Sequence, residues 1–545
     1  MPQEDKEHMK MEGRKFGNYK DRSTFWVSLV VVVTFVLFGV FMPERAEEVF
    51  GEVFDWMMVN TGWAFILGAS FFLIMALVMF ITPIGQIKLG KPEEEPEYNV
   101  YSWFGMLFSC GMGIGLLFWG VSEPVFHYTW PAVAEPETAA AAHEAMRFSF
   151  FHWGLHPWGV YAIVAGSLAY FSYRKGLPMM LSSTLHPILG DDGIYGFWGN
   201  VVNIIGVFAT LFGLATSLGL GAMQIGAGLE TLFGIANTGG LQVTIVAVVT
   251  CVAVISTYTG IDKGIKYLST LNITIAIILL ILVFILGPTV FILDITTHGI
   301  GEYLQNIVGD SFMLDATGEG IRGDWYEAWT IFYWAWWIAW APFVGTFVAR
   351  VSRGRTIRQF VLGVLLVPTA VSTIWFGVFG GSALHFEHVE EVGTIIEAIG
   401  VDEAMGFFES LQLFPASQIL IFAAMTSVAV FFATSSDSGT YVAGMLTSGG
   451  DPDPPLPLRV IWGVLEGSIA AVLLFTGGLS ALQTSSLIGG LPFMIVMLVM
   501  VYCLFKALLE ELREGTLPKE RKRIYDAIEE LQERHEEIDA MTKNE

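Results

Sequence analysis

Charged residues are scarce in this chain, and most of those present are acidic. Of the 545 residues, 15% are charged and 54% are hydrophobic. A soluble domain has about 25% charged residues, so the composition excludes a soluble protein and indicates one that crosses a membrane many times. The 28 basic residues face 52 acidic ones, a formal net charge of -24. This shortage of positive charge argues against nucleic acid as a partner.

Cysteine is also rare. Cys110, Cys251 and Cys503 lie in apolar segments without metal-ligand spacing, which predicts small buried side chains rather than disulfides or a metal site. The chain has no His-Glu-x-x-His zinc pattern, no phosphate-binding P-loop and no nucleophile elbow. We therefore expect neither an enzyme nor a cofactor.

Long apolar runs make up most of the chain. Runs of about twenty apolar residues cross a bilayer as helices. Twelve are predicted, at residues 24–43, 61–82, 101–122, 147–171, 196–219, 240–259, 267–293, 325–349, 357–384, 413–446, 458–476 and 486–508. With both termini in the cytoplasm, only Arg45, Arg147 and Arg322 fall in outer connections, as the positive-inside rule requires. This predicts a multi-pass protein of the cell (plasma) membrane.

The eighth predicted span is crowded with tryptophan. It contains Tyr333-Trp334-Ala335-Trp336-Trp337-Ile338-Ala339-Trp340-Ala341-Pro342-Phe343. Helical spacing places indoles along one side, where they can bind an organic cation. Pro342 removes a backbone donor and clashes with the carbonyl four residues earlier, so we expect the helix to kink or break there.

The third predicted span contains alternate glycines, Gly111-Met112-Gly113-Ile114-Gly115. They weaken the helix, and unwound backbone offers N–H groups to an anion and carbonyls to a cation. Close helix packing is the alternative interpretation. The two disrupted spans lie five helices apart, which is the separation expected for inverted five-helix repeats that enclose a transporter's binding site.

Three segments together resemble one family. They are Gly111 to Gly115, the run Phe118-Trp119-Gly120-Val121-Ser122-Glu123-Pro124, and the block Tyr333 to Arg358. They resemble the betaine/choline/carnitine transporters, and the resemblance covers the whole membrane region. It implies an all-α, leucine-transporter-like fold with two extra N-terminal helices before two inverted five-helix repeats, and a homotrimer.

These expectations divide the chain into parts. They are a cytoplasmic tail (1–23), two peripheral helices (24–100), a first repeat (101–293), an outer connection with an amphipathic helix (294–324), a second repeat (325–508) and a partly helical cytoplasmic tail (509–545). In the last part, Ile524, Ile528, Leu531 and Ile538 recur at helical spacing after an expected interruption at Gly515 to Pro518. This tail is interpreted as a cap or oligomer contact, with regulation as the alternative.

Aromatic residues of the fourth and eighth spans form the expected substrate site. Trp153, Trp158 and Tyr161 fall within one arc of a regular helix. The resemblance implies that these three and Trp337 surround a trimethylammonium group, while Trp336 and Trp340 line the route. A quaternary ammonium donates no hydrogen bond, so aromatic faces must replace its water, at about 0.5 to 2 kcal/mol each.

The remaining polar part of the substrate is expected at the third span. Backbone N–H groups around Gly111, Met112 and Gly113 are the expected partners of a carboxylate, because no Lys or Arg lies in the middle of the disrupted spans. Several choline-carrying relatives have Asp at the position of Gly115, so Gly115 favours glycine betaine over choline.

Hydroxyls of the tenth span suggest a coupling cation. Thr434 and Ser435, with the Met112 carbonyl, offer oxygen ligands to a hard monovalent ion. The resemblance implies one sodium site at Ser109, Met112, Phe431, Thr434 and Ser435. It implies a second site with Thr210 and Phe343, but Leu214 replaces its other threonine, and whether Thr216 or Ser217 compensates is undecided. Asp437 is an acid within the membrane, for which function and pairing are both reasonable interpretations.

Together these features predict a secondary active transporter. We expect import of glycine betaine, or a similar trimethylammonium compatible solute, by sodium symport with alternating access, for osmoprotection. Its partners would be the quaternary ammonium substrate, sodium ions and membrane lipids. The alternative is a sodium-independent or proton-coupled choline or carnitine transporter or exchanger.

Overall fold

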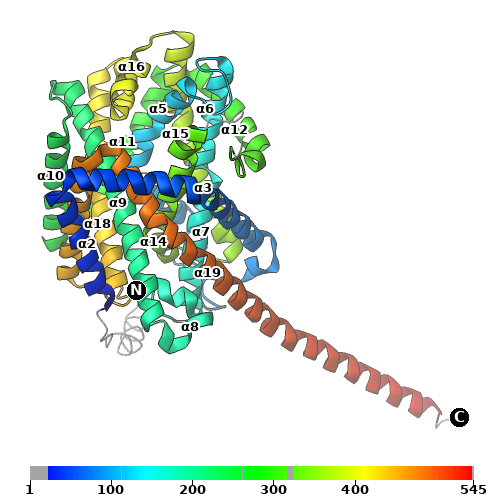
Figure 1. Cartoon of the computed structure of the whole chain (residues 1–545). Coiled ribbons are helices and arrows are strands. Elements are labelled where there is room, and N and C mark those ends of the chain that lie inside the picture. The colour runs from blue at the N-terminus through cyan, green and yellow to red at the C-terminus, as the bar shows by residue number, and fades with distance from the viewer. Residues whose placement is uncertain (1–22, 112, 260–261, 316–322, 543–545) are drawn as a thin grey trace.

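The computed structural model describes residues 23–111, 113–259, 262–315 and 323–542. Within these ranges every regular element is a helix, and the one isolated β-bridge joins Lys88 to Thr356. The expectation of an all-α membrane protein is therefore confirmed. Figure 1 shows the helices gathered into one bundle, with the last part of α19 projecting from it.

The first half of the chain forms ten α-helices and three short helical turns. They are α2 (Ser23–Phe41), α3 (Pro43–Ile81), η1 (Pro83–Gln86), α4 (Val100–Gly111), α5 (Ile114–Thr129), α6 (Ala139–Trp153), α7 (Leu155–Ala169), η2 (Tyr170–Arg174), η3 (Leu181–Leu185), α8 (His186–Gly193), α9 (Phe197–Phe233), α10 (Gly239–Thr259) and α11 (Asp262–Leu286).

The second half continues in the same way. Its elements are α12 (Thr289–Asp310), α13 (Gly323–Tyr326), η4 (Glu327–Ile331), α14 (Phe332–Val351), α15 (Ile357–Leu384), η5 (His385–Val389), α16 (Thr394–Val401), η6 (Glu403–Met405), α17 (Gly406–Gln412), α18 (Ser417–Thr447) and α19 (Leu456–Thr542). Inside α19, Gly478 is non-helical (φ 56°, ψ -132°), so this element is two helices joined at a kink.

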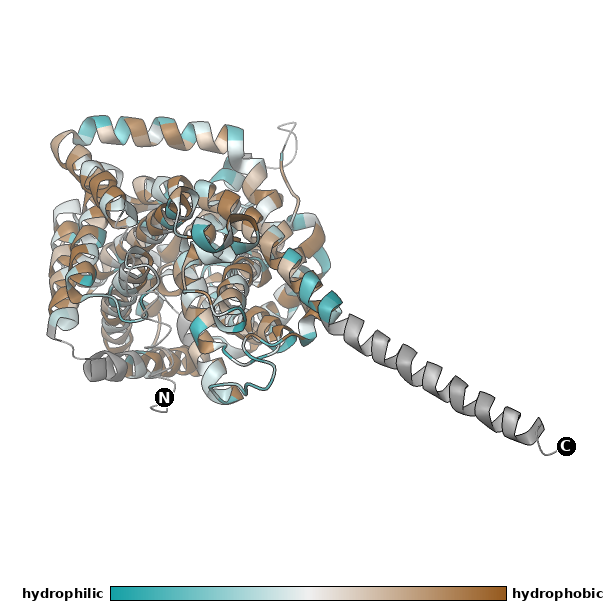
Figure 2. Ribbon diagram, turned by 90° about the horizontal axis from the view of Figure 1, so that it is seen from below, coloured by the Kyte–Doolittle hydropathy of each residue, from teal (hydrophilic) through white to brown (hydrophobic). Residues whose placement is uncertain are grey.

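Among the described residues, eight helices are long and apolar enough to cross a membrane, or nine with the pair Thr270–Leu286 and Thr289–Asp310, which is bent by 109°. Twelve spans stay a prediction. The third and fourth predicted spans are each divided into two shorter helices, and the last two both lie within α19. Hydrophobic residues predominate along many helices of the bundle (Figure 2), and many large apolar side chains of the described residues are exposed, as contact with lipid tails allows.

The expected disruption of the third span is present. Helix α4 ends at Gly111 and α5 begins at Ile114, after an extended Gly113 (φ -145°, ψ -173°). Met112 lies outside the described residues. The first N–H groups of α5 therefore have no partner within their own helix.

The expected break at Pro342 is wrong. Helix α14 runs without interruption from Phe332 to Val351 and includes Pro342. A membrane helix tolerates proline when side chains and neighbouring helices satisfy the freed backbone groups. Here the Thr346 hydroxyl donates to the Pro342 carbonyl at 2.7 Å, and α7, α9 and α19 pack against α14.

A second break divides the fourth predicted span, for which the sequence predicts one regular helix. Helix α6 ends at Trp153, Gly154 is non-helical, and α7 begins at Leu155. A Cβ at residue 154 would lie 2.3 Å from the Phe150 carbonyl oxygen and 2.7 Å from the Tyr303 hydroxyl, so only glycine fits there. The Leu155 N–H donates to that tyrosine hydroxyl at 3.0 Å.

The residues between the first two predicted spans are helical, because α3 begins at Pro43. The helix expected in the outer connection is present as α12, which begins earlier, at Thr289, and buries Ile292, Ile295 and Tyr303. The expected interruption at Gly515 to Pro518 is absent, because α19 continues to Thr542. An intact helix keeps each N–H bonded to the carbonyl four residues earlier, and Pro518 removes only one such bond.

Candidate functional site

A cavity of about 430 Å³, counted with its open mouth, lies between α5, α7, α14 and α15. It is lined by Gly113, Gly115, Leu116, Trp153, Pro157, Trp158, Tyr161, Trp336, Trp337, Trp340 and Ser372. None of these lining residues has a charged side chain. The cavity thus combines aromatic walls with one hydroxyl and with the backbone at the start of α5.

All six aromatic residues expected at the substrate site lie around this cavity. The rings of Trp336 and Trp337 stack with centroids 4.6 Å apart and planes at 15°. Trp153 meets Trp337 edge to face at 4.9 Å and 73°, and Trp158 meets Tyr161 in the same way at 5.3 Å and 79°. Such aromatic groups expose both ring faces and ring edges to a bound molecule.

Trp334 does not belong to this group. Its ring stacks on His156 at 5.1 Å and 19°, away from the cavity lining. The expected row of indoles along one side of the helix is therefore shorter than the sequence suggested. His156 is also bound to the Ser311 hydroxyl at 2.9 Å, which fits a packing role for this histidine.

Hydrogen bonds fix the three indoles of α14 that line the cavity, Trp336, Trp337 and Trp340. The break at Gly154 leaves the His152 carbonyl free of a helix partner, and it accepts the Trp337 Nε1–H at 3.0 Å. The Gly213 carbonyl on α9 accepts from Trp340 Nε1 at 2.9 Å and from Trp336 Nε1 at 3.4 Å. Because each N–H is bound to the protein, the orientation of each ring is set before a substrate arrives.

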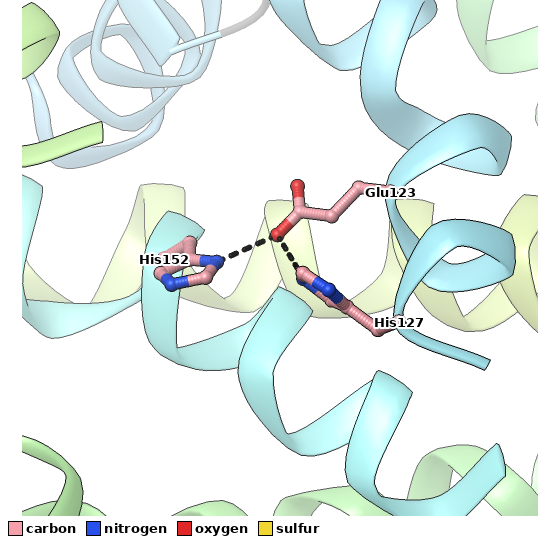
Figure 3. Close-up of side chains that lie close together, drawn as sticks. All are labelled: Glu123, His127 and His152. Carbon is pink, nitrogen blue, oxygen red and sulfur yellow. Dashed lines mark hydrogen bonds and ion pairs between the residues drawn. The ribbon is translucent and has the colours of Figure 1, made fainter. Parts of the chain in front are cut away.

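A buried carboxylate holds the indole of Trp153. Glu123 on α5 accepts hydrogen bonds at Oε2 from Trp153 Nε1 (2.7 Å) and from the Tyr333 hydroxyl (2.6 Å). Its Oε1 lies 2.8 Å from His152 Nδ1 and 3.3 Å from His127 Nε2, as Figure 3 shows. All of these side chains are buried. Glu123 therefore connects α5, α6 and α14 directly behind the cavity.

Glu123, His127 and His152 are also the residues whose ligand atoms suit a metal ion, since these atoms lie within 4.8 Å of one another. Their hydrogen bonds offer a simpler account. His152 Nε2 lies 2.9 Å from the Thr330 hydroxyl, and the carboxylate already accepts from two strong donors. We interpret the group as a support for the aromatic wall.

Gly115 is where the two walls of the cavity come closest. A Cβ added there would lie 2.8 Å from Trp153 Cη2 and 2.9 Å from Trp336 Cη2. Carbon atoms attract best at about 3.5 to 4.0 Å, so any side chain at this position would push the indoles apart. An aspartate at this position would therefore not fit this arrangement.

The residues expected to bind sodium are only partly described. Ser109 and Gly111 belong to α4, but the side chain of Ser109 and all of Met112 lie outside the described residues. On α18, Phe431 is buried, and the Thr434 hydroxyl donates to the Val430 carbonyl at 2.9 Å. Ser435 is half-buried. Helix α18, which carries these three residues, packs against α5.

The residues of the expected second sodium site lie on α9 and α14, which contact each other. Thr210 is buried, and its hydroxyl donates to the Gly206 carbonyl at 2.8 Å. Phe343 packs against Trp340 at 5.7 Å. Leu214 is fully buried.

The possible substitutes for the missing threonine are already engaged. The Thr216 hydroxyl lies within 3.1 Å of the Ser485 and Ser486 hydroxyls on α19. Ser217 donates to the Gly213 carbonyl at 3.4 Å. Neither residue is therefore free to replace the missing threonine without losing these contacts.

Sequence reasoning missed the functional positions of Glu123 and Tyr333. Both stood in segments that were singled out, and a lone acid in an apolar span is itself a signal, because an unpaired charge is costly there. It also missed Leu116, Pro157 and Ser372 in the cavity wall. Of these three, Ser372 could not have been found from the sequence, because it lies on α15, a helix without an unusual sequence pattern.

Comparison with known proteins agrees with this geometry. Residues 23–513 match the betaine/carnitine/choline family transporter model. The glycine betaine transporter OpuD of Bacillus subtilis is 45% identical over 493 residues, covering 90% of this chain and 95% of that protein. A glycine betaine transporter of Acinetobacter baylyi is 41% identical over 486 residues, covering 89% of this chain and 73% of that protein.

A third relative has a different named substrate. The ectoine/hydroxyectoine transporter of Virgibacillus pantothenticus is 42% identical over 481 residues, covering 88% of this chain and 94% of that protein. These relatives are transporters and not enzymes. With a family match that spans nearly the whole chain, this protein belongs to the betaine/carnitine/choline family of membrane transporters.

Proposed function

We propose that this protein imports glycine betaine, or a similar trimethylammonium compatible solute, by sodium symport with alternating access, and so protects the cell from osmotic stress. The observation that carries the proposal is the uncharged, tryptophan-walled cavity at the start of α5. Methyl groups shield the positive charge of betaine, and aromatic faces attract such a cation without a hydrogen bond. Two of the relatives above are named glycine betaine transporters.

The carboxylate of betaine has a matching partner. Gly113, Gly115 and Leu116 line the cavity at the N-terminus of α5. The first N–H groups of a helix lack internal partners and carry partial positive charge, so they suit a carboxylate. Choline has a hydroxyl in place of the carboxylate, so it can accept only weaker, uncharged hydrogen bonds from these groups. This difference supports betaine over the alternative of a choline transporter.

Sodium coupling is supported by the position of Thr434 and Ser435. Both lie on α18, which packs against α5, where the substrate site begins. A cation bound between these two helices would favour the arrangement that also holds betaine, and such mutual preference is what couples two ligands. Because Leu214 stands where the second sodium site needs a threonine, the proposal does not fix the number of coupled sodium ions.

Two further expectations belong to the proposal. We infer that both termini are cytoplasmic, because the connections on that side hold nearly all of the basic residues. We also expect a homotrimer in the cell membrane, as the family resemblance implies. Cysteine labelling from either side of the membrane would test the first statement, and light scattering of the purified protein would test the second.

Uptake of radiolabelled glycine betaine into proteoliposomes tests the function. We expect accumulation only when a sodium gradient points inward, and competition by unlabelled betaine stronger than by choline, carnitine or ectoine. Uptake that is unchanged when potassium replaces sodium would overturn sodium symport. Stronger competition by choline would instead favour the alternative substrate.

A further inference from the structure

Helix α19 contains a buried acid that no part of the proposed substrate site uses. Glu466 is completely buried, and neither of its carboxylate oxygens has a hydrogen-bond partner among the described residues. Among the other buried carboxylates of the described residues, Asp310 Oδ2 also lacks a hydrogen bond, but it lies 3.5 Å from the Arg147 guanidinium. Glu123 accepts from Trp153 and Tyr333. Glu466 is therefore an exception that calls for a ligand.

The carboxylate lies at a junction of helices. A Cβ added at Gly439 on α18 would lie 3.3 and 3.4 Å from the two Glu466 oxygens, and 2.3 Å from a methyl group of Leu214 on α9. Gly439 thus leaves room for the acid beside the apolar Leu214. Helices α9, α10, α18 and α19 all pack against one another around this point.

A second unsatisfied oxygen lies nearby. Ser436 is completely buried, and its hydroxyl also lacks a hydrogen-bond partner among the described residues. It precedes Gly439 by three positions on α18, so both residues belong to the same face of that helix. The face of α18 that meets Glu466 thus offers a hydroxyl together with the carboxylate, and oxygen atoms are the ligands that hard cations prefer.

The charged groups around Glu466 do not neutralise it. Asp437 on α18 adds a second negative charge, and its Oδ1 already accepts from Thr257 on α10 at 2.6 Å and lies 3.4 Å from Arg459 on α19. Arg459 thus forms its ion pair with Asp437 through Nη2, while its Nε has no hydrogen-bond partner among the described residues. The side chains of Lys263 and Lys266 on α11 lie outside the described residues.

A carboxylate in this position needs a positive partner. An isolated ionised carboxylate in apolar surroundings is strongly unfavourable unless it is paired or neutralised. Acids buried within membrane-spanning helices are rare, and they commonly mark ion or proton pathways. The local surroundings supply oxygen ligands, and no base among the described side chains forms an ion pair with Glu466.

We propose that Glu466 is the charged ligand of a monovalent-cation site between α18 and α19, which takes sodium or a proton and contributes a coupled ion to transport. The site is separate from the sodium ligands expected at Phe431, Thr434 and Ser435. It rests on the proposed cation-coupled uptake. Betaine itself has no net charge, so the coupled cations alone set the charge moved in each transport cycle. A cation bound at Glu466 therefore adds one charge per betaine carried.

The charge moved per betaine tests this directly. Proteoliposomes with the full-length protein are clamped at a series of potentials, and the potential at which net betaine flux reverses gives the number of coupled charges. We expect Glu466→Gln, which is isosteric but cannot be ionised, to move one charge fewer than the wild type. Glu510→Gln, an exposed position on the same helix, should behave as the wild type. An unchanged stoichiometry in Glu466→Gln overturns the proposal.

Two gradients identify the cation. If the site takes sodium, the reversal potential of Glu466→Gln depends less on the sodium gradient than that of the wild type. If the site takes a proton, the reversal potential of the wild type depends on the pH gradient at constant sodium, and that of Glu466→Gln does not. A wild type that shows no cation-driven uptake at all contradicts the proposed function instead, so the two failures are distinguishable.

A second variant covers the case in which Glu466→Gln does not fold. Glu466→Asp keeps the charge but withdraws it by one methylene group. We expect Glu466→Asp to move the wild-type number of charges per betaine, but to need a higher concentration of the coupling cation for half-maximal uptake. In detergent, the cation should also raise the thermal stability of this variant less than that of the wild type. A wild-type cation requirement in Glu466→Asp overturns the proposal.

Discussion

Replacing Gly115 by alanine tests the geometry of the aromatic cavity with a single methyl group. The new Cβ would lie 2.8 Å from Trp153 Cη2 and 2.9 Å from Trp336 Cη2. To restore a carbon contact of about 3.5 Å, each indole must move by roughly 0.6 Å or more. Neither ring moves freely, because Glu123 holds Trp153 at 2.7 Å and the Gly213 carbonyl holds Trp336 at 3.4 Å.

The expected loss follows from the aromatic contacts. Each cation–π contact with a desolvated ammonium contributes about 0.5 to 2 kcal/mol. Weakening two of them should cost about 1.4 kcal/mol or more, which raises the Kd for betaine about ten-fold or more. Overpacking should also lower the stability of the protein, by about 1 to 3 kcal/mol.

The assay is betaine titration of the purified protein, by calorimetry or by tryptophan fluorescence, together with a thermal melt. Gly105→Ala is the matched control, because a Cβ at that position on α4 meets no atom within 4 Å. We expect the control to bind betaine as the wild type does. If Gly115→Ala also binds betaine with wild-type affinity, the indoles do not form the substrate site in the arrangement described here.

Three further substitutions probe the same site and its coupling ion. Trp337→Leu should raise the Kd for betaine about ten-fold, because one aromatic wall is lost, whereas Trp334→Phe should leave it unchanged; equal effects in a binding titration would contradict the assignment of the cavity. Glu123→Gln should weaken betaine binding and lower the Tm, because one of the two carboxylate oxygens beside Trp153 and His152 becomes an amide nitrogen, which cannot accept a hydrogen bond. A wild-type Kd and a wild-type Tm in this variant would show that Glu123 does not position the Trp153 indole. Ser435→Ala should raise the sodium concentration for half-maximal uptake several-fold, while exposed Ser438→Ala should not; a sodium dependence unaffected by Ser435→Ala would remove this hydroxyl from the coupling site.

The sequence predicted the aromatic members of the cavity because their chemistry is written in residue type. Trp153, Trp158, Tyr161 and three tryptophans of α14 all line it. Sequence reasoning assigned the wrong cause to their arrangement, however. It expected a break at Pro342, whereas the chain breaks at Gly154, where Phe150 and Tyr303 leave no room for a side chain. Such a contact between distant segments has no local sequence pattern.

For charged residues, too, the sequence predicts the residue type and its place in an apolar span, whereas the tertiary structure decides its contacts. A lone acid such as Glu123 or Glu466 is visible in an apolar span, but its sequence neighbours do not reveal whether it is paired. Packing gives Glu123 two strong donors from α6 and α14, while Glu466 faces Gly439 and Leu214 and receives none among the described residues.

The sequence by itself determined the class of protein, because apolar length and the distribution of basic residues depend only on composition along the chain. It also predicted that the tryptophans bind a quaternary ammonium substrate. Only the tertiary structure decided which indoles share a cavity, how their N–H groups are fixed, and why residue 115 must be glycine. These properties depend on atoms that lie far apart in sequence and within 4 Å in space.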